Sequence, residues 1–151
     1  MKMTVEVHWE RDGAVFTDKR YSRAHVWRFD GGQVVPASAS PHIVPLPYSV
    51  EANVDPEEAY IAAISSCHML TFLSLAAPKQ IVIESYTDHA TGVMEMVDGK
   101  LIVSRVELNP TIVYGGEPPT AAMAAELHHA AHEQCFIANS VKTDIRMAAG
   151  I

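Results

Sequence analysis

Short stretches in which apolar and polar residues alternate surround a long apolar segment in the middle of the chain. Residues 4–10 alternate with a period of two, which is typical of a β-strand. Residues 14–29 predict one or two further strands, with the odd-numbered side chains on the buried face. Arg23 and His25 share that face, whereas Arg28 points to the other one.

A proline-rich loop and then a helix are predicted next. The prolines within residues 35–50 indicate a long, stiff loop, of the kind that often forms a lid or a pocket wall. Asp55 suits a helix N-cap, and Pro56 suits the first helical position, with two acidic residues following in the first turn. We expect this helix to continue to about Ala77 and to end at Pro78.

The second half of the chain predicts a hairpin, a helix and a last strand. These elements are a strand over residues 80–97, a turn at Asp98-Gly99, a strand over 101–114, a helix opened by Pro118-Pro119-Thr120 and ending near Cys135 or Phe136, and a strand from Ser140 to Met147. Strands, helix, hairpin, helix and strand in this order indicate an α+β fold in one domain spanning residues 1–151.

The composition excludes several classes of protein. Hydrophobic residues make up 48% of the chain and charged residues 19%, so a disordered chain is excluded. The formal net charge is −7 and no basic run occurs, which argues against a nucleic-acid partner. The two cysteines are far apart, and the N-terminus lacks the apolar run of a signal peptide. We therefore expect a cytoplasmic protein.

The segment 59–77 carries no formal charge and just reaches the length of a membrane span. It contains Ser65, Ser66 and other polar residues, and neither a cationic flank nor an aromatic belt brackets it. We therefore expect no membrane contact, and interpret the segment as a central helix that is buried on all sides.

Cys67 lies in the middle of this apolar helix. It is about eleven residues from the helix start, so the helix dipole cannot stabilise a thiolate there, and burial disfavours the charged form. A reactive Cys67 therefore needs a cation from another part of the fold, and arginine is the natural candidate. The alternative is an ordinary core cysteine. His68 adjoins Cys67, but its side chain points about 100° away around the helix.

The second helix places His128, His132 and Cys135 on one face, because their spacings are four and three residues. Three interpretations stay open: a solvated or dimer-facing stripe, a thiol partner for Cys67, and a metal site. A metal site needs three or four ligands, which these three residues, Cys67 and His68 could supply only if the fold brought them together.

Two motifs give the chain a specific resemblance. The segment from Asp55 to Cys67 resembles a signature of the OsmC/Ohr family of thiol-dependent hydroperoxidases, in which a cysteine follows a helix-starting glutamate by ten positions. The segment from Ala131 to Ser140 resembles the second cysteine signature of that family, with Phe136 in place of the usual proline. His8-Trp9-Glu10 fits the OsmC branch, so the resemblance extends over nearly the whole chain.

The resemblance implies an OsmC-like fold, with antiparallel sheets around a long central helix in an intertwined homodimer. It implies that Cys67 is the peroxidatic cysteine, which a peroxide oxidises to a sulfenic acid. Cys135 then matches the resolving cysteine, which closes the disulfide. Glu57 matches the carboxylate that orients an activating arginine.

Geometry constrains the role of Glu57. Ten helical residues rise about 15 Å, so Glu57 and Cys67 of one chain cannot serve one site through a straight helix. Either the helix breaks, or Glu57 acts on Cys67 of a second chain, which agrees with the homodimer that the resemblance implies.

The activating arginine is less well defined by the sequence. Arg28-Phe29-Asp30-Gly31 resembles a motif of the OsmC branch, and Arg11-Asp12-Gly13 resembles one of the Ohr branch. Arg23 matches neither motif but lies on the face predicted to be buried. We rank Arg23 and Arg28 equally, followed by Arg11.

The predicted function is reduction of alkyl or fatty-acid hydroperoxides by Cys67 and Cys135, without a cofactor or metal. Met69, Phe72 and the Pro41–Pro47 loop are expected to line the substrate pocket. An external dithiol, such as a lipoyl protein, would supply the electrons. Two alternatives are a metal-binding protein that uses the Cys/His cluster and a non-catalytic binding module.

Overall fold

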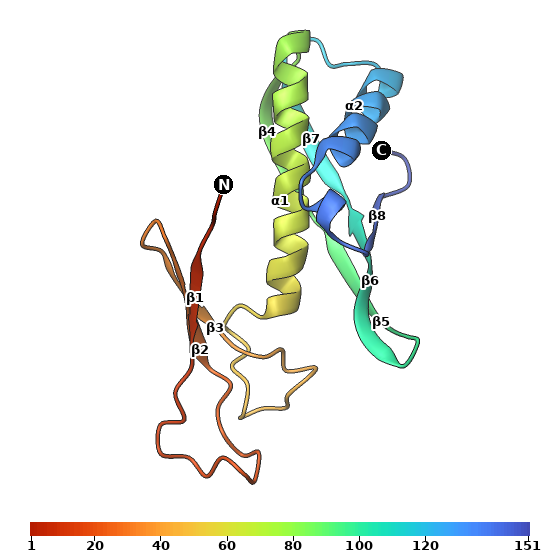
Figure 1. Cartoon of the computed structure of the whole chain (residues 1–151). Helices are drawn as coiled ribbons and strands as arrows, with labels where there is room; N and C mark the ends of the chain where they lie inside the picture. Colours follow the sequence, from red (N-terminus) through yellow and green to blue (C-terminus); the bar gives the residue numbers. More distant parts are fainter. The chain divides into compact units, whose positions relative to one another are not determined.

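A computed structural model describes residues 1–151, which form two compact units. The first unit comprises Met1–Ala59 and the second Tyr60–Ile151, and each is described by itself. Figure 1 shows the course of the chain and the labels of its helices and strands.

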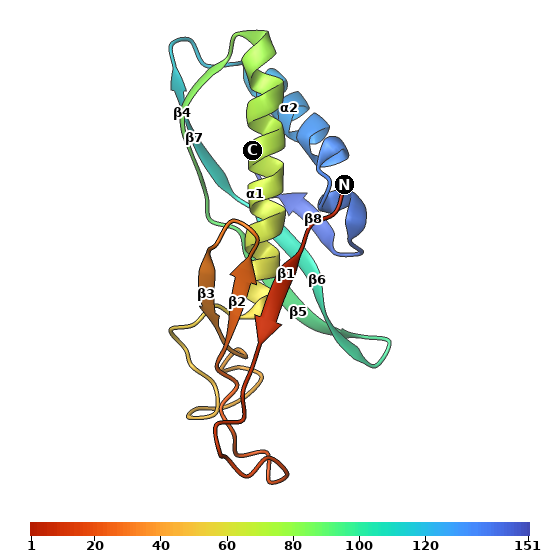
Figure 2. The same ribbon diagram turned by 60° about the vertical axis from the view of Figure 1, so that its left-hand side comes forward.

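The first unit contains a three-stranded antiparallel sheet (Figure 2). Its strands, in the order β1-β2-β3, are β1 (Val5–His8), β2 (His25–Phe29) and β3 (Val34–Ala37). Only one strand forms within residues 14–29. The chain before β2 instead folds into a loop, in which the rings of Phe16 and Tyr21 stack with centroids 4.7 Å apart.

The strand β3 corrects the prediction that residues 35–50 are loop throughout. It contains Pro36, which lacks the N–H that a central strand needs. The proline is accommodated because β3 lies at the edge of the three-stranded sheet, where its other side forms only an isolated parallel bridge between Ala37 and Val54.

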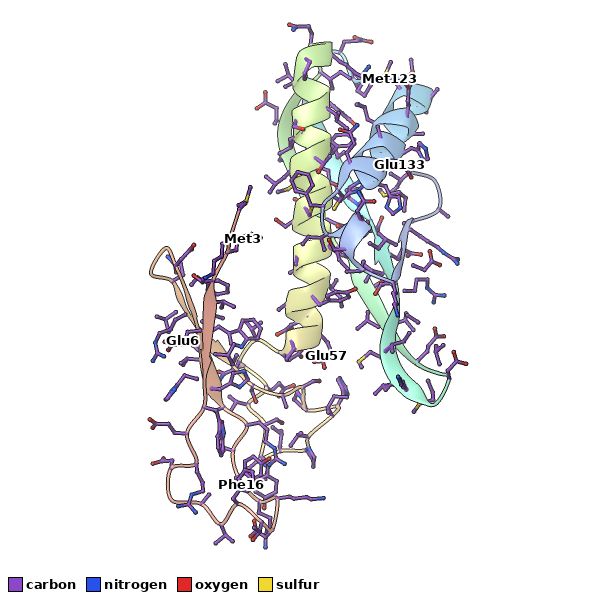
Figure 3. All side chains as sticks on the ribbon, in the orientation of Figure 1. Met3, Glu6, Phe16, Glu57, Met123 and Glu133 are labelled. Carbon is purple, nitrogen blue, oxygen red and sulfur yellow. The ribbon has the colours of Figure 1, made fainter.

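Helix α1 (Pro56–Ala76) begins as predicted, with a capping box. The Glu58 N–H donates to the Asp55 carboxylate at 2.8 Å, and the Asp55 N–H donates to the Glu58 carboxylate at 2.9 Å. Figure 3 shows Glu57 at this end of the helix. The helix then runs without a break to Ala76 and closes in a 3₁₀ turn that contains Pro78.

The second unit contains two small sheets and helix α2 (Ala121–Gln134), whose N-cap is Thr120. The elements of the sheets are β4 (Val82–Asp88) with β7 (Pro110–Gly115), and β5 (Thr91–Val97), β6 (Lys100–Leu108) and β8 (Asp144–Met147). All pairs are antiparallel except β6 with β8, which are parallel. Asp98 and Gly99 form the predicted hairpin turn, with φ of 49° and 74°.

The two long strands predicted in this half of the chain each divide into two. The chain leaves the β4-β7 sheet after Asp88 and enters the β5-β6-β8 sheet at Thr91. It returns to the β4-β7 sheet after Asn109. The Asp88 carboxylate holds the two crossing points together, because it accepts the Asn109 N–H at 2.6 Å.

The core of the second unit lies in two clusters along α1. Phe72 and Ala76 pack against Leu127 and Ala131 of α2, with side chains of β4 and β7 around them. Ile64 packs against Val106 and other residues of the β5-β6-β8 sheet. Figures 1 and 2 show α2 beside α1 and the β4-β7 pair along another side of the helix.

The expectation that α1 is buried on all sides is wrong for the single chain. Its buried residues are every fourth one: Ile64, His68, Phe72 and Ala76. Leu70 on the opposite side is 59% exposed. By length and composition the helix could cross a membrane, but its buried stripe packs against α2 and the sheets of its own chain.

Candidate functional site

Cys67 lies beside the buried stripe of α1. It precedes His68, a member of that stripe, and its own side chain is half-buried. A side chain one position away lies about 100° around the helix axis, so Cys67 stands between the packed and the open sides of α1. At this border a thiol is shielded from bulk water and can still be reached by a ligand.

Cys135 ends α2 as its C-cap residue and is 1% exposed. Its backbone leaves the helix, with ψ of 118°. The following turn folds back on the sulfur, and the Ala138 N–H donates to Cys135 Sγ at 3.4 Å. The thiol is therefore held at the point where α2 gives way to the next segment.

The thiols of Cys67 and Cys135 are neighbours in the structure. Burial raises the pKa of Cys135, the neighbouring Cys67 thiol raises it further, and the Ala138 N–H acts in the opposite direction. Both cysteines are free. Of the three interpretations of the second helix, a thiol partner for Cys67 is thus the one that the geometry favours.

An open pocket of about 700 Å³ borders Cys67. Its lining residues are Ala63, Ser66, Cys67, Leu70, Thr71, Ser74, Gln134, Phe136 and Asn139. Phe136 is 83% exposed, and together with Leu70 it provides apolar surface next to hydroxyl and amide groups. The pocket can accept an organic group and present a polar atom to the thiol.

This lining differs from the one predicted from the sequence. Phe72 is fully buried between His128 and Tyr86, and neither it nor Met69 lines the pocket. In the sequence Phe136 stands out only as a departure from a motif, and no pattern singles out Leu70. Their exposure depends on how α2 and the following turn pack against α1, which the sequence pattern does not reveal.

The histidines form a buried pair rather than a site with the thiols. His68 Nε2 and His128 Nδ1 are hydrogen-bonded at 3.1 Å, and the rings are parallel to within 8°. A second pocket, of about 230 Å³, reaches both rings and is also lined by His129 and His132. Nowhere do three or more His, Cys, Asp or Glu side chains converge to hold a metal ion.

Arg23 is held firmly within the first unit. Its Nη1 donates to the Lys19 and Tyr21 carbonyls, and its guanidinium carbon lies 3.8 Å from the centroid of the Tyr21 ring. The backbone N–H of Arg23 donates to the Tyr48 carbonyl at 2.8 Å. This side chain is half-buried, but the predicted alternation of faces is not seen, because Ala24 and Val26 are half-buried as well and Phe29 is exposed.

Arg28 is exposed and forms an ion pair with Glu6 across β1 and β2. Its charge is therefore already engaged on the solvent side of the sheet. The roles predicted for Arg23 and Arg28 stay predictions.

Glu57 lies in the first turn of α1, and its Oε2 is buried without a hydrogen-bond partner. A buried carboxylate oxygen without a partner is costly. Since α1 is continuous from Pro56 to Ala76, the rise of about 15 Å over ten residues separates Glu57 from Cys67 of the same chain. The broken-helix alternative is thus wrong, and the role of Glu57 stays a prediction.

Comparison with known structures gives close and distant matches. An OsmC-like protein of unknown function from Vibrio cholerae is 53% identical, with a TM-score of 0.94 and 97% of each chain covered. Structures from Legionella pneumophila (TM-score 0.69) and Bacillus subtilis (0.67), each 16% identical, are described as organic hydroperoxide resistance proteins. They cover 97% of this chain and 95% and 96% of their own. No curated protein sequence matches.

The two distant structures support the fold alone. The structure from Vibrio cholerae and a family model also show to which family the chain belongs. The model described as OsmC-like protein matches residues 50–149, a range that includes Glu57, Cys67 and Cys135. The α+β fold and the resemblance inferred from the two cysteine motifs are thereby confirmed, and the chain belongs to the OsmC family.

Proposed function

We propose that the protein is a thiol-dependent peroxidase that reduces organic hydroperoxides. One observation carries the proposal: two free thiols are neighbours within one chain, and one of them borders a pocket with partly apolar walls. Family membership supports the same activity, because two structural relatives are described as organic hydroperoxide resistance proteins.

The chemistry proceeds in two steps. The Cys67 thiolate attacks the terminal oxygen of the hydroperoxide, the O–O bond breaks, and Cys67 becomes a sulfenic acid, while the departing alkoxide takes a proton from water to become the alcohol. The Cys135 sulfur then attacks the Cys67 sulfur, the S–O bond breaks, and the departing hydroxide takes the thiol proton to form water. The organic group of the substrate would lie against Leu70 and Phe136, whose apolar surface disfavours hydrogen peroxide as a substrate.

Arg23 is our preferred source of the activating charge. Stacking on Tyr21 and two carbonyl contacts hold its guanidinium in one place. Arg28 already has Glu6 as its partner. A fixed guanidinium loses little entropy when it binds a thiolate and a carboxylate, and Glu57 has an oxygen without a partner.

The activity is proposed to reside in a homodimer. The uncharged outer side of α1, where Leu70 is exposed, and the distance of Glu57 from Cys67 along the helix both favour a second copy of the chain over a lipid bilayer as the partner. Glu57 of one subunit would then act on Cys67 of the other. A cytoplasmic location and an external dithiol reductant, such as a lipoyl protein, complete the proposal, since the cycle ends in a disulfide that must be reduced.

The decisive experiment counts thiols in reduced protein after addition of one equivalent of cumene hydroperoxide. We expect rapid loss of two thiols per chain, and a slower loss with hydrogen peroxide. In Cys135→Ser the sulfenic acid should accumulate and react with dimedone.

Cys67→Ser is the matched control, in which Cys135 should stay reduced. If both thiols of the unmodified protein persist in organic peroxide, the peroxidase proposal fails and a non-catalytic binding module becomes the better interpretation.

A further inference from the structure

His68 and His128 are among the most buried polar residues of the protein. They are 2% and 3% exposed, respectively, and their ring nitrogens are 3.1 Å apart. In such a contact one nitrogen donates a proton and the other accepts it, so the pair requires defined tautomers. A hydrogen-bonded polar pair in the core favours one arrangement, because a shift that breaks the bond leaves a buried nitrogen without this partner.

The pair joins the two helices that carry the thiols. It is the only side-chain hydrogen bond between α1 and α2, and no ion pair connects them. Packing contacts between the helices include Phe72 stacked on the His128 ring with centroids 4.4 Å apart, and Phe72 and Ala76 against Leu127 and Ala131. Apolar surfaces can slide against one another with little loss, whereas a hydrogen bond sets both depth and rotation.

The pair also has a suitable place relative to the sulfurs. His68 directly follows Cys67 on α1, and His128 precedes Cys135 by seven residues, about two helical turns. Residues two turns apart lie on nearly the same side of a helix, so His128 and Cys135 both face α1. Fixing His128 on His68 therefore fixes the end of α2 at which the Cys135 thiol meets Cys67.

We propose that His68 and His128 are positioning residues that hold Cys135 Sγ against Cys67 and so set the rate of disulfide closure. This rests on the proposed peroxidase function. Neither imidazole contacts the reacting atoms. In the closing step the S–S bond forms as the S–O bond of the sulfenic acid breaks, and hydroxide leaves with the thiol proton as water. A misplaced Cys135 leaves the sulfenic acid exposed to a second peroxide, which oxidises it to the sulfinic acid.

The test separates the two chemical steps in His68→Leu/His128→Leu, which keeps an apolar contact but removes the hydrogen bond. The first step, loss of the Cys67 thiol, should stay within about threefold of the unmodified protein. Closure, measured from the lifetime of the dimedone-reactive species, should slow about tenfold, the effect of losing one hydrogen bond. Sulfinic acid should increase in proportion.

A conservative pair provides the rescue. The side-chain amides of His68→Gln/His128→Asn can occupy the positions of the two bonded ring nitrogens, and closure should return to near the unmodified rate. His89→Leu is the matched control, since His89 is exposed and borders neither pocket. If the double-leucine variant fails to fold, His128→Gln serves in its place, because it retains an amide but moves it one bond outward.

A readout without peroxide distinguishes the two proposals. Titration with oxidised and reduced glutathione gives the effective concentration of Cys135 at Cys67, which should fall about tenfold in the leucine or glutamine variant. If the effective concentration and the closure rate of the variant both match those of the unmodified protein, the positioning role is refuted, whether or not peroxide oxidises the thiols. If peroxide consumes no thiol while the effective concentration still falls, the proposed function fails and the positioning role stands.

Discussion

Arg23 and Arg28 differ in the groups that their guanidinium groups contact. Arg28 neutralises Glu6 at the surface, whereas Arg23 contacts only carbonyl groups and an aromatic ring. A guanidinium without a carboxylate partner retains its full capacity to stabilise a thiolate. At the scale of single residues, this difference gives the first prediction.

Arg23→Ala should slow the oxidation of Cys67 by cumene hydroperoxide about a hundredfold, because the thiolate loses its stabilising charge. Arg28→Ala, the matched control, should stay within about twofold, since exposed ion pairs contribute little. Stopped-flow measurement of thiol loss compares the two variants. Equal effects, or a larger effect at Arg28, would remove Arg23 from the proposed site.

Cys135 should titrate above an ordinary thiol. Burial raises its pKa first, and contact with Cys67 raises it further. A raised pKa keeps the group protonated at neutral pH, so its alkylation should have a midpoint above that of a cysteine in an unfolded peptide. Mass spectrometry of iodoacetamide-treated native protein across pH measures this. Burial of the sulfur slows iodoacetamide at every pH, so it changes the absolute rate but not the midpoint. A midpoint at or below that of the peptide would contradict the burial of Cys135 beside Cys67.

At the scale of elements, the sequence predicts best what neighbouring residues determine. The start of α1 follows from Asp55, Pro56 and Glu58, which satisfy one another within a single turn. The hairpin at Asp98-Gly99 likewise needs only the backbone conformation of two residues. Both cysteine motifs are likewise short segments of the sequence, so the family could also be predicted from it.

Features set by distant parts of the chain could not be predicted in this way. The division of each long strand depends on a change of sheet that Asp88 secures from another segment. The partner of His68 lies 60 residues away, on another helix. The exposure of Phe136 likewise depends on tertiary packing, which hydrophobic periodicity does not encode.

The histidine pair should make the packing of α1 on α2 sensitive to acid. Burial lowers the pKa of His68 to about 4, the charges of His128 and His132 act in the same direction, and Asp88 opposes them. Burial also lowers the pKa of His128, again opposed by Asp88. The folded state thus binds fewer protons than the unfolded chain, so stability is complete above the unfolded pKa near 6.5 and is lost as the pH falls from there towards 4.

Urea unfolding at a fixed protein concentration should therefore show a free energy of unfolding that falls by roughly 1 kcal/mol for His68 alone between pH 6.5 and 5.5. His68→Gln/His128→Asn should lose most of this dependence while keeping the other six histidines. An unchanged slope in that variant would mean that other groups govern the acid response.

At the scale of the whole molecule, the continuous helix α1 sets the strongest geometric constraint on the proposed site. Glu57 and Cys67 are ten residues apart on a helix without a break, so a shared function requires two chains. The outer side of α1 is uncharged and exposes Leu70, so we expect a second copy to cover it. A dimer with two equivalent sites would then build each site from Glu57 of one subunit and Cys67 of the other.

Mixing two inactive variants tests this arrangement directly. Glu57→Gln and Cys67→Ser should each lack peroxidase activity, one without the orienting carboxylate and the other without the nucleophile. After joint unfolding and refolding in equal amounts, half of the dimers contain one chain of each kind. If the site is shared between chains, each mixed dimer has one complete site, and the mixture regains about a quarter of the unmodified activity. If Glu57 serves the cysteine of its own chain, no combination contains a complete site, and the mixture stays as inactive as its components.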